Sequence, residues 1–221
     1  MDRHITALKV QKKNPNRINL YLDGEFAFGI SRIVAAWLKV GQALSEERIK
    51  SLQQEDAQEV AYQNALRLIS YRPHSVHEVQ NKLQENGFDE SVIQSVIVRL
   101  GESGLVEDKS FAQAWIENRT VFRPRSRRLM AIELRQKGVP DEVVQNALAD
   151  AVDDETLAFQ SAILFARRLK KLEWQDFRKK LSAYLLRRGF SFDTVAPIVR
   201  RVWDEKQQEA GNAAQIDNED E

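Results

Sequence analysis

Apolar residues recur along most of this chain at the spacing of amphipathic helices, and the same apolar pattern returns every 51 residues. Gly87, Gly138 and Gly189 mark this period, and each has a leucine four residues before it and an apolar residue directly after it. Further apolar residues follow each glycine at helical spacing: Val92, Ile93, Val96 and Ile97; Val143, Val144, Ala147 and Leu148; Val195, Ile198 and Val199. Self-similarity at a fixed period is typical of helical repeat proteins. The pattern therefore predicts one helical unit used three times.

Each unit is predicted to contain three helices. In the first unit, Ser75 and Glu78 have the spacing of a capping box at the start of the second helix, and Gly87 can end that helix in a left-handed conformation. In the second unit, the corresponding helix begins near Ser126, and Pro140 can begin the third helix. The predicted repeats are residues 54–104, 105–153 and 154–206.

The first 53 residues follow a different period. Two runs alternate apolar and polar residues, and we expect each run to place its apolar members on one face: Ile18, Leu20 and Leu22, then Phe26, Phe28 and Ile30. Between them stands Asp23-Gly24, the sequence of a type I′ hairpin turn. Ser31 can cap a short helix, and Ser45 can begin another. Residues 1–53 are predicted to form a small β-hairpin module with helices.

The predicted fold class is therefore mainly α, an elongated array of three tandem three-helix repeats preceded by a small β-hairpin module. Stacked repeats contact only their neighbours, so such arrays present an extended surface that suits a long partner better than a small molecule. Residues 207–221 are small, polar and largely acidic, and we predict a disordered acidic tail there.

Composition narrows the possible functions. The chain has no cysteine, which excludes disulfides and thiolate metal sites and fits a cytoplasmic location. No apolar run approaches the ~20 residues of a membrane span, so we expect no membrane association. Lys and Arg together number 33 and so do Asp and Glu, so net charge gives no general attraction to nucleic acid.

Sequence motifs for catalysis are missing. The chain contains neither GxxxxGK[ST] nor GxGxxG nor GxSxG, and no HExxH accompanies the histidines. We expect His4, His74 and His77 to be surface residues rather than metal ligands. The sequence thus predicts no catalytic residue, no cofactor and no metal site, and a protein that is not an enzyme.

Basic residues are the stronger signal, and they concentrate in the second and third units. Arg127-Arg128 and Lys179-Lys180 lie at predicted helix starts, where the helix dipole mildly disfavours a cation. This placement hints at an anionic partner, although solvated helix faces are the simpler alternative. Aromatic residues do not interleave with these cations in a way that indicates stacking on single-stranded nucleic acid. The candidate partner or nucleic-acid contacts are Arg119, Arg123, Arg125, Arg127, Arg128, Arg135, Lys137, Arg167, Arg168, Lys170, Lys171, Lys179 and Lys180.

Together with the triple repeat, two stretches resemble motifs of the regulatory protein RecX family: GLVEDKSFAQAWIENR at 104–119 and IELRQKGVPDEVV at 132–144. Residues 65–88 are similar to the first repeat of that family, and residues 21–31 to its N-terminal extension. The resemblance covers roughly residues 5–205. The sequence departs from the family pattern at two places: FRPRS at 122–126 replaces a basic-glycine step, and Trp174 stands where the earlier repeats have Pro73 and Pro124.

The resemblance implies a non-enzymatic regulator of the RecA recombinase. Members of the family bind in the groove of the RecA–DNA filament, restrain its ATPase, strand-exchange and coprotease activities, and thereby limit recombination and the SOS response. Many also bind DNA, single- or double-stranded. We expect a monomer with RecA as its partner. The alternative from the residues alone is a helical DNA-binding protein of architectural or transcriptional type, because three-helix units resemble helix-turn-helix folds.

Overall fold

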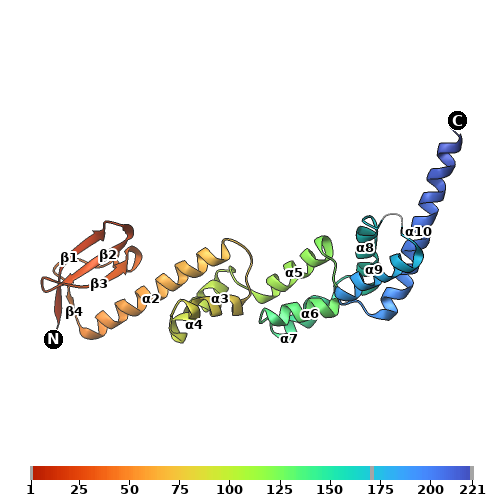
Figure 1. Cartoon of the computed structure of the whole chain (residues 1–221). Helices are drawn as coiled ribbons and strands as arrows, with labels where there is room; N and C mark the ends of the chain where they lie inside the picture. The colour runs from red at the N-terminus through yellow and green to blue at the C-terminus, as the bar shows by residue number, and fades with distance from the viewer. Residues whose placement is uncertain (1, 170–171, 220–221) are drawn as a thin grey trace. The chain divides into compact units, whose positions relative to one another are not determined.

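The structure, a computed structural model, describes residues 2–169 and 172–219, with side chains described up to residue 209. It is mainly helical, with a small antiparallel sheet at the N-terminus followed by three-helix repeats (Figure 1). The chain divides into two compact units, residues 1–107 and 108–221. The first unit holds the sheet and the first repeat, and the second unit holds the other two repeats. The predicted class, mainly α with three three-helix repeats after a β module, is confirmed.

The N-terminal sheet has the strand order β3-β2-β1-β4. Its strands and the short helix that follows β3 are β1 (Arg3–Gln11), β2 (Asn14–Leu22), β3 (Glu25–Ser31), α1 (Arg32–Ala35) and β4 (Ala43–Leu44). Leu20, Leu22 and Ile30 are fully buried, and Leu52 of the next helix joins their cluster. Three or four short strands need a covering element for stability, and that helix provides it.

The predicted hairpin turn is confirmed, because Asp23 and Gly24 both have positive φ, 53° and 90°. The predicted face of the third strand is wrong at Phe26, which is 58% exposed. The cause is a register shift: Leu20 pairs with Phe28, but Tyr21 pairs with Phe26. The extra residue in β3 breaks the alternation, and Phe26 instead packs edge-on against Tyr21 at 5.9 Å between ring centroids.

Helix α2 (Glu46–Ile69) crosses the predicted boundary at residue 53 without a break. Its first half covers the sheet, where Asp56 accepts hydrogen bonds from Arg17 (Nη2, 2.8 Å) and from the Ser31 amide (2.6 Å). Its second half belongs to the first repeat, in which Ala61 and Ala65 are fully buried. One helix thus joins the two parts of the first unit, where the sequence suggested two separate helices.

The first repeat is completed by α3 (Val76–Glu85) and α4 (Glu90–Glu102). The capping box predicted at the start of α3 is confirmed. The Glu78 amide donates to Ser75 Oγ (3.1 Å), and the Ser75 amide donates to the Glu78 carboxylate (3.3 Å). The expectation of a surface histidine is wrong for His74, which is 8% exposed and whose Nδ1 lies 2.8 Å from the Arg72 carbonyl oxygen.

The second unit contains the other two repeats. Their helices are α5 (Asp108–Phe122), α6 (Arg127–Gln136), α7 (Asp141–Ala149), α8 (Asp154–Ala166), α9 (Trp174–Arg187) and α10 (Phe192–Glu219). One apolar cluster runs through both repeats, from Phe111 and Leu134 to Phe177 and Val199. The 51-residue period is visible in the backbone, since Gly87, Gly138 and Gly189 all have positive φ after the second helix of their repeat.

Of the predicted disordered tail, residues 220–221 lie outside the described residues, and residues 207–219 belong to the last helix. Helix α10 continues to Glu219, so residues 207–219 are helical. The physical reason is composition: this stretch carries Ala, Gln and Glu, which favour helix, and it extends a helix that is already anchored in the core. Helix propagation adds a hydrogen bond per residue without a new nucleation cost.

Candidate functional site

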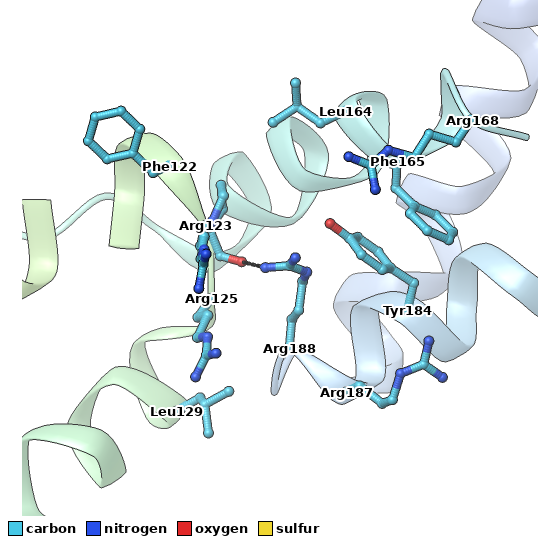
Figure 2. Close-up of a pocket in the computed structure, with 11 residues that line it drawn as sticks. Phe122, Arg123, Arg125, Leu129, Leu164, Phe165, Arg168, Tyr184, Arg187 and Arg188 are labelled. Atoms are coloured by element: carbon cyan, nitrogen blue, oxygen red, sulfur yellow. Dashed lines mark hydrogen bonds between the residues drawn. The ribbon is translucent and has the colours of Figure 1, made fainter. Parts of the chain in front are cut away.

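The second unit contains a cleft of about 780 Å³ between its two repeats (Figure 2). Five arginines line it, and none of the described residues that line it is acidic. They come from the end of α5 and the segment before α6, from the end of α8, and from the end of α9. The lining residues are Phe122, Arg123, Pro124, Arg125, Leu129, Leu164, Phe165, Arg168, Tyr184, Arg187 and Arg188. We call this the arginine cleft.

Backbone contacts between the repeats hold one wall of the cleft. The Ser126 amide donates to the Arg188 carbonyl oxygen (3.0 Å). The Arg188 side chain donates through Nη1 to the Pro124 carbonyl oxygen (3.1 Å), and Figure 2 draws this bond as a dashed line. Gly189 lets these two segments of the chain approach closely, since a Cβ at this position would lie 2.5 Å from Ser126 Oγ. The turn after α9 and the segment before α6 are therefore fixed together.

Aromatic rings form a second wall. Phe165 and Tyr184 stack with 3.9 Å between centroids and 7° between planes. The guanidinium carbon of Arg188 lies 4.4 Å from the Tyr184 centroid, which is a cation–π distance. Phe122 is 73% exposed at the edge of the cleft. The sequence analysis found no aromatic residues interleaved with the cations, because these rings come from three separate helices.

The cleft carries more positive than negative charge. Burial lowers the pKa of the Arg125 guanidinium, and the nearby cations Arg119, Arg188 and Arg123 lower it further. One carboxylate is close by: Glu133 accepts from Arg119 Nε (2.8 Å) and forms an ion pair with Arg125. An anion entering the cleft would relieve this repulsion, and guanidinium groups bind phosphate or carboxylate through paired hydrogen bonds.

Three of the predicted contact residues line this cleft: Arg123, Arg125 and Arg168. Arg128 lines an adjoining hollow that shares Leu129 and Arg187 with the cleft. The structure therefore brings together residues from the second and third repeats that are up to 45 positions apart in the sequence, counting from Arg123 to Arg168.

Other predicted contact residues make contacts within the fold. The Arg119 guanidinium lies 4.2 Å from the Trp115 centroid and pairs with Glu133. Arg127 donates through Nη2 to the Leu148 carbonyl oxygen, and its amide donates to Asp154 (2.7 Å).

Further candidates lie elsewhere in the second unit. Arg135 pairs with Asp141 at 2.6 Å, and Lys137 Nζ lies 5.0 Å from the Trp115 centroid. Arg167 and Lys179 line two other hollows, and Lys180 is exposed on α9. Lys170 and Lys171 lie outside the described residues.

Sequence reasoning left Arg187 and Arg188 out of the candidate set. Their position explains this, because they end α9, where the helix dipole favours a cation and a structural role suffices. The sequence did contain a signal for these two arginines. Both directly precede the repeat glycine Gly189, whereas the second repeat has Gln136 and Lys137 at the corresponding positions.

Three-helix repeats behind a small sheet, with a basic cleft between two of the repeats, define a helical repeat protein with a basic surface. Its sequence matches four family models in order: the RecX N-terminal domain at residues 3–45 and the first, second and third RecX three-helix domains at residues 61–100, 108–148 and 153–199. This chain belongs to the RecX family.

Relatives support the assignment. A regulatory protein RecX of Bacillus subtilis (strain 168) is 30% identical over 202 residues, covering 90% of this chain and 76% of the relative. A regulatory protein RecX of Clostridium perfringens (strain SM101 / Type A) is 31% identical over 204 residues, covering 90% and 95%. A crystal structure of a regulatory protein RecX is similar with a TM-score of 0.68 and 25% identity, covering 89% of this chain and 98% of that chain.

Among the side chains of residues 2–169 and 172–209, no group of three or more His, Asp or Glu could hold a metal ion. In the same part of the chain, no helix has both the length and the apolar character needed to cross a membrane.

Proposed function

We propose that this chain is a non-enzymatic regulator that binds the RecA recombinase and the RecA–DNA filament. It modulates, and mostly inhibits, the ATPase, strand-exchange and coprotease activities of RecA, and so regulates DNA repair and the SOS response. Its membership of the RecX family supports this function, since the relatives are named regulatory proteins. The domain order also supports it, because the four family domains follow one another along nearly the whole chain.

The arginine cleft is the observation that carries this proposal. Five guanidinium groups without a lining carboxylate attract a polyanion, and a RecA–DNA filament carries one in its phosphate backbone. Guanidinium forks pair with phosphate oxygens, and the exposed ring of Phe122 offers an apolar face beside them. We assign filament contact to Arg123, Arg125, Arg168 and Arg187, with Arg128 beside them.

A double charge reversal tests the assignment. The side chains of Arg168, which follows the end of α8, and Arg187, which ends α9, make no described hydrogen bond or ion pair, so Arg168→Glu with Arg187→Glu should leave helix content unchanged. We expect the variant to bind RecA filaments on single-stranded DNA at least about tenfold more weakly in co-sedimentation, because two attractive charges become repulsive. Lys180→Glu, on the exposed face of α9 outside the cleft, is the matched control and should bind like the unmodified chain. Equal binding by all three proteins would refute the assignment.

The alternative, an architectural or transcriptional DNA-binding protein, keeps a specific observation in its favour: the cleft combines cations with the stacked pair Phe165 and Tyr184. That function predicts tight binding to duplex DNA in the absence of RecA. Its affinity would fall steeply with salt, with a log–log slope of about −0.9 for each phosphate neutralised. Weak duplex binding together with RecA-dependent recruitment to DNA would exclude it.

A further inference from the structure

The third repeat carries a second hollow, of about 800 Å³, between α9 and α10 on a different set of residues from the arginine cleft. Small and apolar side chains line it: Ala183, Leu186, Ala196, Val199, Trp174 and Phe192. Phe192 is 69% exposed and Leu186 is 44% exposed. We call this the α9–α10 groove.

The repeats themselves provide the reference for this groove. Residues 51 and 102 positions earlier occupy the same places in the second and first repeats. Where the third repeat has Leu186 and Phe192, the second has Arg135 and Asp141, which form an ion pair at 2.6 Å. The first repeat has Gln84 and Glu90, both exposed.

The neighbouring positions change in the same direction. Ala196 corresponds to Gln145 in the second repeat and to Gln94 in the first, and both glutamines are exposed. The three-helix fold therefore forms with polar residues at these places, and the exposed apolar residues Leu186, Phe192 and Ala196 are not needed to build it. Exposed apolar residues that a fold does not require indicate a binding surface.

The charged residues that line the groove indicate the charge of its partner. Arg178 and Lys179 of α9 and Arg200 of α10 line its rim, and Asp176 is the single acidic residue among the described residues that line it. The Arg200 guanidinium lies 5.3 Å from the Trp174 centroid, which keeps a cation beside this ring. Small residues such as Ala183 and Ala196 let another backbone approach two helices closely, as in helix-in-groove recognition.

We propose that the α9–α10 groove binds an amphipathic helix of a partner protein, with apolar residues at helical spacing and acidic residues on its flanks. Leu186 and Phe192 contact the apolar face of that helix, and Arg178, Lys179 and Arg200 contact its acidic flanks. A second copy of this chain fits less well, because a two-fold symmetric pairing through this groove would set its basic rim against itself. The proposal does not depend on RecA or on nucleic acid.

The repeat comparison supplies a variant that should fold. Leu186→Arg with Phe192→Asp places the residues of the Arg135–Asp141 ion pair at the equivalent positions of the third repeat. It removes the exposed apolar pair without disturbing a buried side chain. Val98→Arg is the control, because Val98 is a 57% exposed apolar residue on α4, outside the groove.

A library of random 16-residue peptides displayed on phage tests the proposal with the full chain as bait. We expect peptides enriched on the unmodified chain to carry apolar residues at i, i+3/i+4 and i+7 with an excess of Asp and Glu beside them. Synthetic copies should bind the double variant at least about tenfold more weakly, and bind the Val98→Arg variant with unchanged affinity.

Several results would overturn the proposal: no enrichment above the double variant, enriched peptides with basic flanks, or equal affinity for the unmodified chain and the double variant. Sedimentation velocity tests the other candidate occupant of the groove, a second copy of this chain. A dimer of the unmodified chain that the double variant cannot form would assign the groove to a second copy and reject a foreign helix. Because neither RecA nor DNA is present, failure here is separate from failure of the proposed regulatory function.

Discussion

At the residue scale, Glu133 organises the basic side of the second repeat. Its carboxylate accepts from Trp115 Nε1 (2.9 Å) and Arg119 Nε (2.8 Å) and forms an ion pair with Arg125. Its side chain is 11% exposed, and that of Arg119 is 16% exposed. A buried charge is stable when its partner is present and costly when the partner is removed. Glu133 therefore holds the cations of this repeat in a fixed arrangement.

Removing Glu133 should destabilise the second unit more than it changes any surface contact. We expect Glu133→Ala to lower the free energy of unfolding by about 3 kcal/mol, because Arg119 keeps its charge in a buried place without its carboxylate. Hydrogen exchange of the α5 and α6 amides in urea measures this. Glu117→Ala, an exposed glutamate of α5, is the control. A loss below 1 kcal/mol, equal to that of the control, would contradict the role given to Glu133.

Two repeat glycines give a matched pair for a second prediction. Gly87 and Gly189 have φ of 83° and 86°, so alanine is strained at both. At Gly87 nothing lies within 4 Å of an added Cβ, whereas at Gly189 Ser126 Oγ and Leu129 Cβ lie at 2.5 and 2.8 Å. We expect Gly87→Ala to cost roughly 1 kcal/mol of stability from the backbone alone. Gly189→Ala should cost about 2 kcal/mol more, from overpacking against α6. Equal losses in urea denaturation would show that Gly189 does not join the repeats.

The sequence allowed the positions of these glycines to be predicted, but not their different surroundings. A positive φ after a helix follows from local chemistry, and the 51-residue period makes it readable. Contact between Gly189 and Ser126 depends on how two repeats pack, which no local pattern encodes. The same reason applies to the candidate cations. The sequence does not distinguish Arg119 and Arg127 from Arg123, yet Arg119 and Arg127 make contacts within the fold and Arg123 lines the cleft.

At the element scale, α2 changes the description of the first unit. The predicted boundary at residue 53 lies in the middle of a 24-residue helix. Leu52 belongs to the core of the sheet, and Ala61 belongs to the core of the first repeat. The sequence pattern predicted helices on both sides of residue 53. It did not show that they form one helix, because the half of α2 that covers the sheet carries many polar residues.

A proline substitution at residue 53 tests whether α2 is one continuous helix or two separate helices. We expect Gln53→Pro to cost about 3 kcal/mol or more, because proline removes a helical hydrogen bond and clashes with the preceding turn. Hydrogen exchange should report opening of β3 and of the first half of α2 together. Gln53→Ala, at the same exposed position, should leave exchange unchanged or slower. Full tolerance of the proline would restore the predicted boundary at residue 53.

At the scale of the whole molecule, the three repeats share a fold and differ in their surfaces. Where the second helix ends and the third begins, the first repeat has Gln84 and Glu90, the second has the Arg135–Asp141 pair, and the third has Leu186 and Phe192. The arginine cleft needs the second and third repeats together. Duplicated helices thus supply the framework, and the two proposed binding surfaces consist largely of residues that differ between the repeats.

The most direct test of the central claim is the ATPase rate of RecA on single-stranded DNA with this protein titrated in. We predict that the unmodified chain lowers the rate in a concentration-dependent manner. The Arg168→Glu, Arg187→Glu variant should require at least about tenfold more protein for the same effect, while Lys180→Glu behaves like the unmodified chain. An ATPase rate that stays unchanged with excess protein at low salt would contradict regulation of RecA, and equal inhibition by all three proteins would contradict the arginine cleft as its contact surface.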